Sequence, residues 1–373
     1  MRVALVHDWL TGMRGGEKAL EAVCELYPDA PLSTLVHVRG SVSPAIERRP
    51  IRTSFVQRLP GASRIYRQYL PLFPLAIEQF GFDDAGVVVS FSHCVAKSVV
   101  TPGRVRHLCY CFTPMRYAWD QFDAYFGPAR VGRAASAALR PVLARLARWD
   151  RATSGRPDRY LAISQYVAGR IRRYYNREAA VVYPPVDTVF YHPLPGAGTG
   201  APAGHFLIVS ALVPYKRVEL AMEACARAGA RLRIVGDGPE RERLERLAGP
   251  EVEFAGRLPD EAVRDEYRRA AAVLLPGEED FGIVPLEAQA CGRPVVALAR
   301  GGALETVVDG DTGVLVPEAD AAAFAQGLER AARLRFDAAR IRAHAERFSR
   351  ARYAREMRTA IEETAAAPAG QAW

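Results

Sequence analysis

Residues 271–298 read AAVLLPGEEDFGIVPLEAQACGRPVVAL and contain one complete strand–loop–helix–strand unit. The apolar run AAVLLP predicts a buried strand, which an acidic loop follows. PLEAQACG predicts a helix that begins near Pro285, because proline suits the first helical turn, and RPVVAL predicts a second strand. Strands joined by a helical crossover run parallel, so this stretch predicts an α/β domain with a parallel sheet.

The same alternation continues on both sides. In the second half of the chain, HFLIVSAL, RLRIVG, VEFAG and GVLV predict further strands, with helices from about Val218 and Asp260 and in ALETVVDG. The first half has predicted strands at Val3–His7 and over 87–91, 107–111 and 160–163, and a helix from about Glu17. The architecture is therefore used twice, as two Rossmann-like domains.

The length of 373 residues is typical of two domains. Residues 193–204 are rich in glycine, proline and small side chains, as linkers are. We predict an acceptor-side domain over 1–190, a donor domain over 191–350, and a C-terminal helix with a frayed tail over 351–373. The last helical stretch is predicted over about 337–364. Ligands of open α/β sheets bind beyond the carboxyl ends of the strands, so a cleft between two such edges is expected.

Composition excludes several classes of protein. The chain is 49% hydrophobic and 25% charged, which suits a folded core. No stretch has the ~18 uninterrupted apolar residues that span a membrane. His7 and Asp8 directly follow the first apolar run, unlike a secretory signal, and the six cysteines lack the spacing of a disulfide framework. A cytoplasmic protein is expected.

Charge is unevenly distributed. Residues 1–190 contain 26 Lys and Arg and 15 Asp and Glu, a net +11, whereas the rest contains 24 and 27, a net −3; together these give +8. A basic half favours an anionic partner, such as nucleic acid, an acidic membrane face or a phosphorylated substrate. A solvated arginine-rich surface is the alternative. No nucleic-acid recognition module is visible, so no nucleic-acid partner is expected.

The loop and helix within 276–296 carry the clearest chemistry. Gly282 allows close backbone approach, and the amides of Gly282, Ile283 and Val284 are expected at a helix N-terminus, which favours a diphosphate. Glu287 is expected in the first turn, where its carboxylate accepts hydrogen bonds from ribose hydroxyls. Glu279, eight positions earlier, is expected to meet a second polyhydroxyl group. Stabilisation of the helix N-terminus by the two glutamates is the alternative.

Glu279-x7-Glu287, within EDFGIVPLEAQACGRPVVA, resembles the signature of family 4 retaining glycosyltransferases of the GT-B fold, in which two Rossmann-like domains face each other across a cleft. SALVPYKRVELAM, GDGPERERLERL and HDWLTGMRGGEKALE match the same family. CYCFTPMRYAWD, SHCVAKSVV and VVYPPVDTVFY resemble its bacterial mannosyltransferase branch, which builds O-antigen and other surface polysaccharides. The resemblance covers nearly the whole chain.

The resemblance implies roles for individual residues. Lys216 and Arg217 are expected to face the donor diphosphate and to stabilise the charge that grows on the leaving group. It implies no cofactor and no metal, the nucleotide sugar being a substrate. Gly15 and Gly16 are expected to approach the donor phosphates. The expected catalytic residues are Lys216, Arg217, Glu279 and His93, and the expected substrate-binding residues are Gly15, Gly16, Lys216, Arg217, Glu279, Phe281, Gly282, Ile283, Val284 and Glu287.

Two positions depart from the family pattern. Ala211 stands where many relatives have an arginine five residues before the lysine. Phe112 stands where the family commonly has a histidine near the reacting sugar, and His93 is the nearest substitute, with a structural role as its alternative. Two further patterns have simpler interpretations: Gly236-x-Gly238 as a tight turn, and Asp309-x-Asp311 as a turn that does not bind metal.

The segment 52–80 combines arginines with aromatic residues and is too rich in proline for one helix. Together with 144–156 it predicts a membrane interface, with ordinary packing as the alternative. We expect an enzyme that is attached peripherally to the cytoplasmic face of the plasma membrane. It is expected to transfer mannose from GDP-mannose to a lipid-diphosphate-linked glycan. A UDP-sugar donor, a degenerate subunit that binds sugar nucleotide or acts as a scaffold, and a sugar-nucleotide epimerase are the alternatives.

Overall fold

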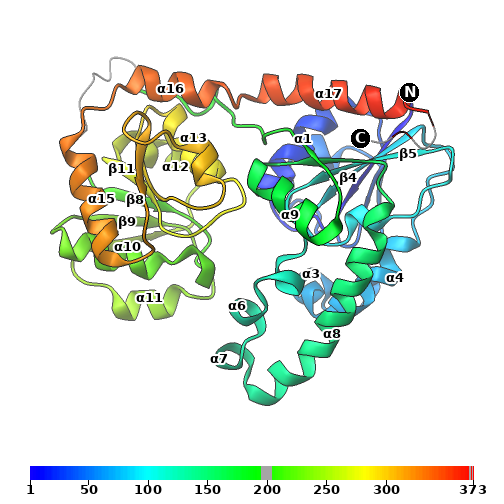
Figure 1. Cartoon of the computed structure of the whole chain (residues 1–373), viewed down its shortest axis with the longest axis horizontal. Helices are drawn as coiled ribbons and strands as arrows, with labels where there is room; N and C mark the ends of the chain where they lie inside the picture. Colours follow the sequence, from blue (N-terminus) through cyan, green and yellow to red (C-terminus); the bar gives the residue numbers. More distant parts are fainter. Residues whose placement is uncertain (195–203, 369–370, 372) are drawn as a thin grey trace. The chain divides into compact units, whose positions relative to one another are not determined.

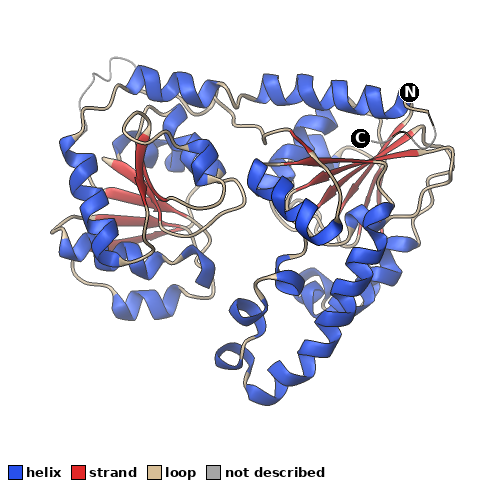
Figure 2. Cartoon of the chain, viewed as in Figure 1, coloured by secondary structure: helices blue, strands red, loops and turns tan. Residues whose placement is uncertain are grey.

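The computed structural model describes residues 1–194, 204–368, 371 and 373 (Figure 1). The chain divides into unit 1, Met1–Pro185 with Ala351–Trp373, and unit 2, Val186–Arg350. In each unit the strands form one layer with helices on both sides (Figure 2). Most of the predicted linker, and residues 369, 370 and 372 of the predicted frayed tail, lie outside the described residues.

Unit 1 contains a parallel sheet of seven strands in the order β3-β2-β1-β4-β5-β6-β7. The order reverses direction between β1 and β4, and the carboxyl ends of these two strands are the usual place for a ligand in such sheets. The strands are β1 Val3–His7, β2 Leu32–Thr34, β3 Ile51–Thr53, β4 Val87–Ser92, β5 Arg106–Cys111, β6 Arg159–Ala162 and β7 Ala180–Val181.

Unit 2 contains a parallel sheet of six strands in the order β10-β9-β8-β11-β12-β13, with the reversal between β8 and β11. The strands are β8 Phe206–Val209, β9 Leu232–Val235, β10 Val252–Gly256, β11 Ala272–Leu275, β12 Val295–Leu298 and β13 Gly313–Val316. The predicted α/β class with two parallel sheets is confirmed.

The helices of unit 1 are α1 Gly15–Leu26, α2 Pro44–Glu47, α3 Ala62–Ile65, α4 Phe73–Glu78, α5 Arg116–Trp119, α6 Phe122–Phe126, α7 Pro128–Val131, α8 Arg133–Ala152, α9 Gln165–Tyr175 and α17 Arg350–Ala366, with 3₁₀ turns η1 Phe55–Arg58, η2 Tyr66–Leu72, η3 Ala96–Ser98 and η4 Thr153–Gly155. Those of unit 2 are α10 Val218–Arg227, α11 Arg241–Leu247, α12 Asp260–Arg269, α13 Ile283–Ala290, α14 Ala303–Thr306, α15 Ala321–Arg333 and α16 Ala338–Glu346, with η5 Pro214–Lys216. No helix in this described part of the chain is long and apolar enough to cross a membrane.

The C-terminal segment differs from its prediction in two ways. The structure has two helices where one was predicted. They are separated at Phe348, which is buried, and at Ser349, which forms a β-bridge with Val186. α17 also belongs to unit 1 rather than standing apart. Its Tyr353 is fully buried, with its ring 5.7 Å from that of Tyr110. The structure places the unit boundary after Pro185, five residues earlier than the sequence analysis did.

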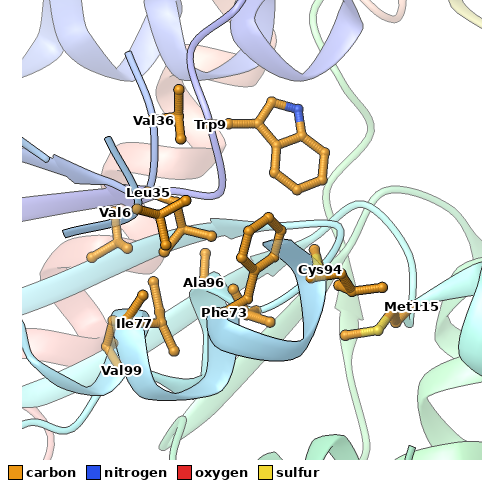
Figure 3. Packing of buried hydrophobic residues seen from close by; sticks show 14 of the residues in the cluster. Val6, Trp9, Leu35, Val36, Phe73, Ile77, Cys94, Ala96, Val99 and Met115 are labelled. Atoms are coloured by element: carbon orange, nitrogen blue, oxygen red, sulfur yellow. The ribbon is translucent and has the colours of Figure 1, made fainter. Parts of the chain in front are cut away.

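Trp9 connects the end of β1 to the segment 52–80. Its ring centroid lies 5.1 Å from Tyr66 and 6.1 Å from Phe73, inside the main core of unit 1 (Figure 3). The segment begins with the end of β3 and then folds as four short helical pieces, η1, α3, η2 and α4. This packing holds η2 beside the carboxyl end of β1.

Candidate functional site

Loops after the strands of unit 2 pack backbone against backbone. The amide of Gly302 donates a 2.8 Å hydrogen bond to the carbonyl of Glu279, and a Cβ at Gly302 would overlap the backbone of Phe281. Gly301 pairs with Glu279 and has a φ of +59°. The loop after β12 therefore requires glycines and fixes the acidic loop after β11.

The neighbouring loops are held in the same way. A Cβ at Gly277 would overlap the carbonyl of Tyr215, and one at Gly236 or Gly238 would overlap the carbonyl of Ser210 or Leu212, respectively. The turns after β8, β9, β11 and β12 thus form one closely packed edge. Gly236-x-Gly238 lies between β9 and a turn at residues 239–240, and its glycines are required by close approach.

Lys216 and Glu279 form an ion pair at this edge. Each side chain is 16% exposed. Lys216 is the last residue of η5 and lies next to the backbone of Gly277. This contact between the loops after β8 and β11 brings the side chains of Lys216 and Glu279 together, although they are far apart in the sequence. These two predicted residues therefore share one site.

Arg217 does not join this pair within the described residues. It has a φ of +52° and directly precedes α10, so the chain turns sharply between Lys216 and Val218. Arg217 lines a cavity of about 340 Å³ with Glu219, Glu223 and other residues of α10 and of the 319–322 segment. That both cations face one diphosphate stays a prediction.

Glu287 lies in the second turn of α13, one turn later than predicted, because the helix begins at Ile283. The residue is 6% exposed, and its carboxylate accepts a 2.9 Å hydrogen bond from the Tyr267 hydroxyl. Burial and then the charge of Glu287 raise the pKa values of Tyr267 and Tyr191. Sequence analysis assigned neither tyrosine a role: Tyr191 ends the VVYPPVDTVFY motif but was not singled out, and Tyr267 belongs to no motif.

The start of α13 combines half-buried and buried positions. Gly282 has a φ of +88° and precedes the helix, and the side chains of Ile283 and Val284 are half-buried. Phe281 is 3% exposed, and its ring lies 6.0 Å from that of Phe348. Its side chain is therefore part of the core, and substrate binding at Phe281 stays a prediction.

At the carboxyl edge of the unit 1 sheet, Asp8 organises the turn after β4. One carboxylate oxygen accepts hydrogen bonds from the backbone amides of His93 and Cys94, at 2.7 and 2.9 Å. The other accepts from Val95 and Ala96, at 2.6 and 2.8 Å. Burial raises the pKa of Asp8, and these bonds oppose that effect. Sequence analysis did not assign Asp8 a role.

His93 lies beside Asp8, with its Nδ1 3.2 Å from an Asp8 oxygen. Its ring centroid is 4.3 Å from Trp9 and 6.2 Å from Phe112. Burial lowers the pKa of His93 to about 3, and nearby guanidinium groups lower it too. The imidazole is therefore neutral at neutral pH and suited to hydrogen bonding rather than to charge stabilisation.

Gly15 and Gly16 begin α1 at the same edge. A Cβ at Gly16 would lie 3.3 Å from the Phe112 ring and 3.6 Å from His7 Nε2. The structure thus brings His93, Phe112 and the two glycines together.

Asp309 and Asp311 bind arginines. Asp309 pairs with Arg330 at 2.8 Å, and Asp311 pairs with Arg340 at 2.9 Å. Asp309 also accepts a hydrogen bond from the Leu315 amide, as in a turn.

Comparisons with known proteins show similarity in sequence and in fold. A family model described as Glycosyl transferases group 1 matches residues 203–351. The D-inositol 3-phosphate glycosyltransferase of Acidothermus cellulolyticus is 37% identical over 177 residues, covering 40% of this chain and 39% of that protein. The GDP-mannose-dependent alpha-(1-6)-phosphatidylinositol monomannoside mannosyltransferase of Mycolicibacterium smegmatis is 34% identical over 185 residues, covering 42% and 48%. The chain thus matches less than half the length of these relatives.

Likeness in fold extends further. The Anabaena protein HepE, solved in complex with UDP-glucose, has a TM-score of 0.69 over 97% of this chain and 100% of its own, at 16% identity. The chain therefore has two parallel-sheet α/β domains with GT-B glycosyltransferases as structural neighbours, and residues 203–351 match the group 1 glycosyl transferases.

Proposed function

We propose that the protein is a retaining glycosyltransferase that transfers mannose from GDP-mannose to a lipid-linked oligosaccharide in the synthesis of a surface polysaccharide. The observation that carries the proposal is the Lys216–Glu279 pair on closely packed loops at the carboxyl edge of the unit 2 sheet. The family match over 203–351 includes both residues.

The proposed chemistry uses Lys216 as the cation for the departing diphosphate. Negative charge on this group grows as the glycosidic bond breaks, so a fixed ammonium group stabilises the transition state more than the ground state. Glu279 holds Lys216 in place and offers oxygens to the hydroxyls of the hexose. In a transfer with retention, a departing phosphate oxygen accepts the proton of the acceptor hydroxyl.

Glu287 is proposed to bind the hydroxyls of the nucleoside. Its place in α13, and the hydrogen bond from Tyr267, fix the direction of the carboxylate. The amides at the start of α13 are proposed to bind diphosphate oxygens. In unit 1, His93 is proposed to hydrogen-bond the transferred sugar as a neutral imidazole held by Asp8.

GDP-mannose is favoured as donor by the resemblance to the mannosyltransferase branch and by the Mycolicibacterium smegmatis relative, named for GDP-mannose. UDP-glucose in the HepE complex favours the alternative of a UDP-sugar. A thermal-shift series with GDP, UDP and ADP separates the two: GDP is expected to stabilise the protein most.

Peripheral binding to the cytoplasmic face of the plasma membrane is proposed for unit 1. α8 exposes five arginines, and its only acidic residue, Asp150, is buried. Leu72 and Leu75 of the segment 52–80 are 39% and 56% exposed. Cationic and apolar side chains on the same domain suit an anionic lipid surface.

The direct test is transfer of radiolabelled mannose from GDP-mannose to bacterial membranes that contain lipid-linked glycans. Label in the lipid fraction supports the proposal. The second candidate, a degenerate sugar-nucleotide-binding subunit, is motivated by Phe112 and Ala211. It predicts nucleotide binding with neither transfer nor donor hydrolysis.

A further inference from the structure

A fully buried ion pair involves the residue that follows the His93 turn, residues 93–96. Lys97 Nζ lies 3.1 Å from Asp150 Oδ1, and the two side chains are 1% and 0% exposed. Lys97 belongs to η3, and Asp150 lies near the end of α8, 53 residues further along the chain. The pair therefore connects the His93 turn to a helix that is distant in sequence.

The Lys97 ammonium group has a complete set of partners. It donates hydrogen bonds to the carbonyl of Asp150 at 2.7 Å and to the hydroxyls of Thr153 and Ser98, both at 3.2 Å. An ammonium group has three protons to donate, so these bonds use all of them. Its Nζ also lies 4.7 Å from the centre of the Tyr175 ring, a cation–π contact. The ammonium group thus connects η3 to the end of α8 and to α9.

The Asp150 carboxylate is fixed by groups from other helices. Its Oδ2 accepts hydrogen bonds from Trp119 Nε1 at 2.8 Å and from the Tyr175 hydroxyl at 2.9 Å. Its Oδ1 accepts no hydrogen bond within the described part of the chain and lies against the Lys97 ammonium group. Loss of either charge would therefore leave the other buried without its counter-charge.

Two buried charges hold the two ends of the His93 turn. Asp8 accepts the amide of His93 and also the amides of the next three residues. At the other end, the Lys97 amide donates to Ser92 Oγ at 3.1 Å, while the Lys97 side chain is fixed by its ion pair. Ser92 is the last residue of β4. The place of the His93 imidazole therefore depends on both charges.

A buried ion pair contributes little net stability, because the desolvation of two charges cancels much of their attraction. Its hydrogen bonds instead fix the direction between the segments that they join. We propose that Lys97, through its pair with Asp150, is a positioning residue that holds the 93–96 turn where His93 meets the transferred sugar. The inference rests on the proposed function for the role of His93.

The double variant K97M–D150N removes both charges at once, so neither is left buried alone. Methionine fills the space of the lysine stem, and asparagine keeps an oxygen for the donors of Trp119 and Tyr175. Urea unfolding is expected to show a folded double variant. K97M alone is expected to unfold at lower urea, because Asp150 then lacks its counter-charge.

Hydrogen–deuterium exchange tests the hold on the turn without any substrate. In K97M–D150N the amides of residues 93–97 are expected to exchange about tenfold faster, the scale of one hydrogen bond. R159M–E363Q, which removes the ion pair between Arg159, the first residue of β6, and Glu363, is the matched control and should leave this exchange unchanged. T153V retains both charges and removes one acceptor of the ammonium group, so it should give a smaller increase and serves if the double variant does not fold. Wild-type exchange in the folded variants overturns the proposal.

Kinetics separates positioning from a general loss of structure. In K97M–D150N, kcat is expected to fall about tenfold or more, because displacing a positioned group lowers the rate steeply. KM for GDP-mannose should not change, since its nucleotide is proposed to bind unit 2. In an H93A background the same double substitution is expected to have no further effect, because it acts through His93. Equal reductions of kcat with and without His93 overturn the proposal.

The two measurements also separate this inference from the proposed function. Faster exchange of the 93–97 amides in K97M–D150N, with no mannosyl transfer by the wild type, supports the hold of Lys97 on the turn and refutes the proposed function alone. Mannosyl transfer by the wild type, with both exchange and kcat unchanged in K97M–D150N, refutes the positioning role alone.

Discussion

The Asp8 carboxylate lies 3.2 Å from His93 Nδ1 and accepts the amide of the same residue at 2.7 Å. D8N replaces an oxygen with an amide group that donates, so amides of the 93–96 turn lose their acceptor. We expect unit 1 to lose about 3 kcal/mol of stability, from two charge-assisted hydrogen bonds at about 1.5 kcal/mol each. Urea unfolding followed by tryptophan fluorescence measures this. Unchanged stability would show that the turn does not depend on Asp8.

Lys216→Ala is expected to lower kcat about 100-fold or more, with a smaller effect on donor affinity, because its cation acts mainly on charge that develops in the transition state. R227A, an exposed arginine of α10 paired with Glu223, is the control and should leave kcat unchanged. Steady-state kinetics with GDP-mannose gives both values. A K216A enzyme with wild-type kcat would remove Lys216 from the chemistry.

Glu287→Ala is expected to weaken binding of the nucleotide, because the carboxylate is proposed to hold its hydroxyls. Loss of about 2 kcal/mol, roughly 30-fold in Kd, is the scale of charged hydrogen bonds. Y267F separates positioning from direct contact: it retains the carboxylate, removes the hydrogen bond to it, and should have the smaller effect. Calorimetry with GDP makes the comparison, and equal affinities for E287A and wild type would contradict the role.

Gly302→Ala tests the packed loops of unit 2. The new Cβ would overlap the backbone of Phe281 and displace the loop that carries Glu279, so GDP affinity and thermal stability should both fall. At Gly103, exposed and with open space around its Cβ position, the same substitution should have no effect. A G302A protein that binds GDP like the wild type would show that the contact is dispensable.

Stability should depend on the ionisation of Glu17. Burial raises its pKa from 4.5 to about 7, so the folded state favours the protonated acid, and this contribution is complete below pH 4.5 and lost as the pH rises through 7. E17Q should therefore match the wild type near pH 4.5 and be more stable at pH 8, by up to about 3 kcal/mol. E25Q, an exposed glutamate of α1, is the control. A stability difference that is the same at both pH values would contradict this interpretation.

Sequence analysis predicted the two parallel sheets because short apolar runs, which are typical of buried strands, alternate with helical patterns along the chain. It also named Lys216 and Glu279, through the resemblance of their motifs. That both lie at one edge follows from the rule that parallel strands end on the same side of their sheet.

Contacts between segments that are far apart in the chain could not be predicted from the sequence. The helix α17 joins unit 1 through Tyr353 and Tyr110, which no local pattern relates. The left-handed backbone of Arg217 has no signal in the sequence either. The hydrogen bond from Tyr267 to Glu287 likewise depends on the packing of α12 against α13.

Hydrogen–deuterium exchange of the full chain with and without GDP tests most directly whether the nucleotide binds at the Lys216–Glu279 edge of unit 2. Peptides that cover 213–218 and 277–287 are predicted to become protected from exchange. GDP binding that protects other parts of unit 2, and leaves these two peptides unchanged, would contradict the account.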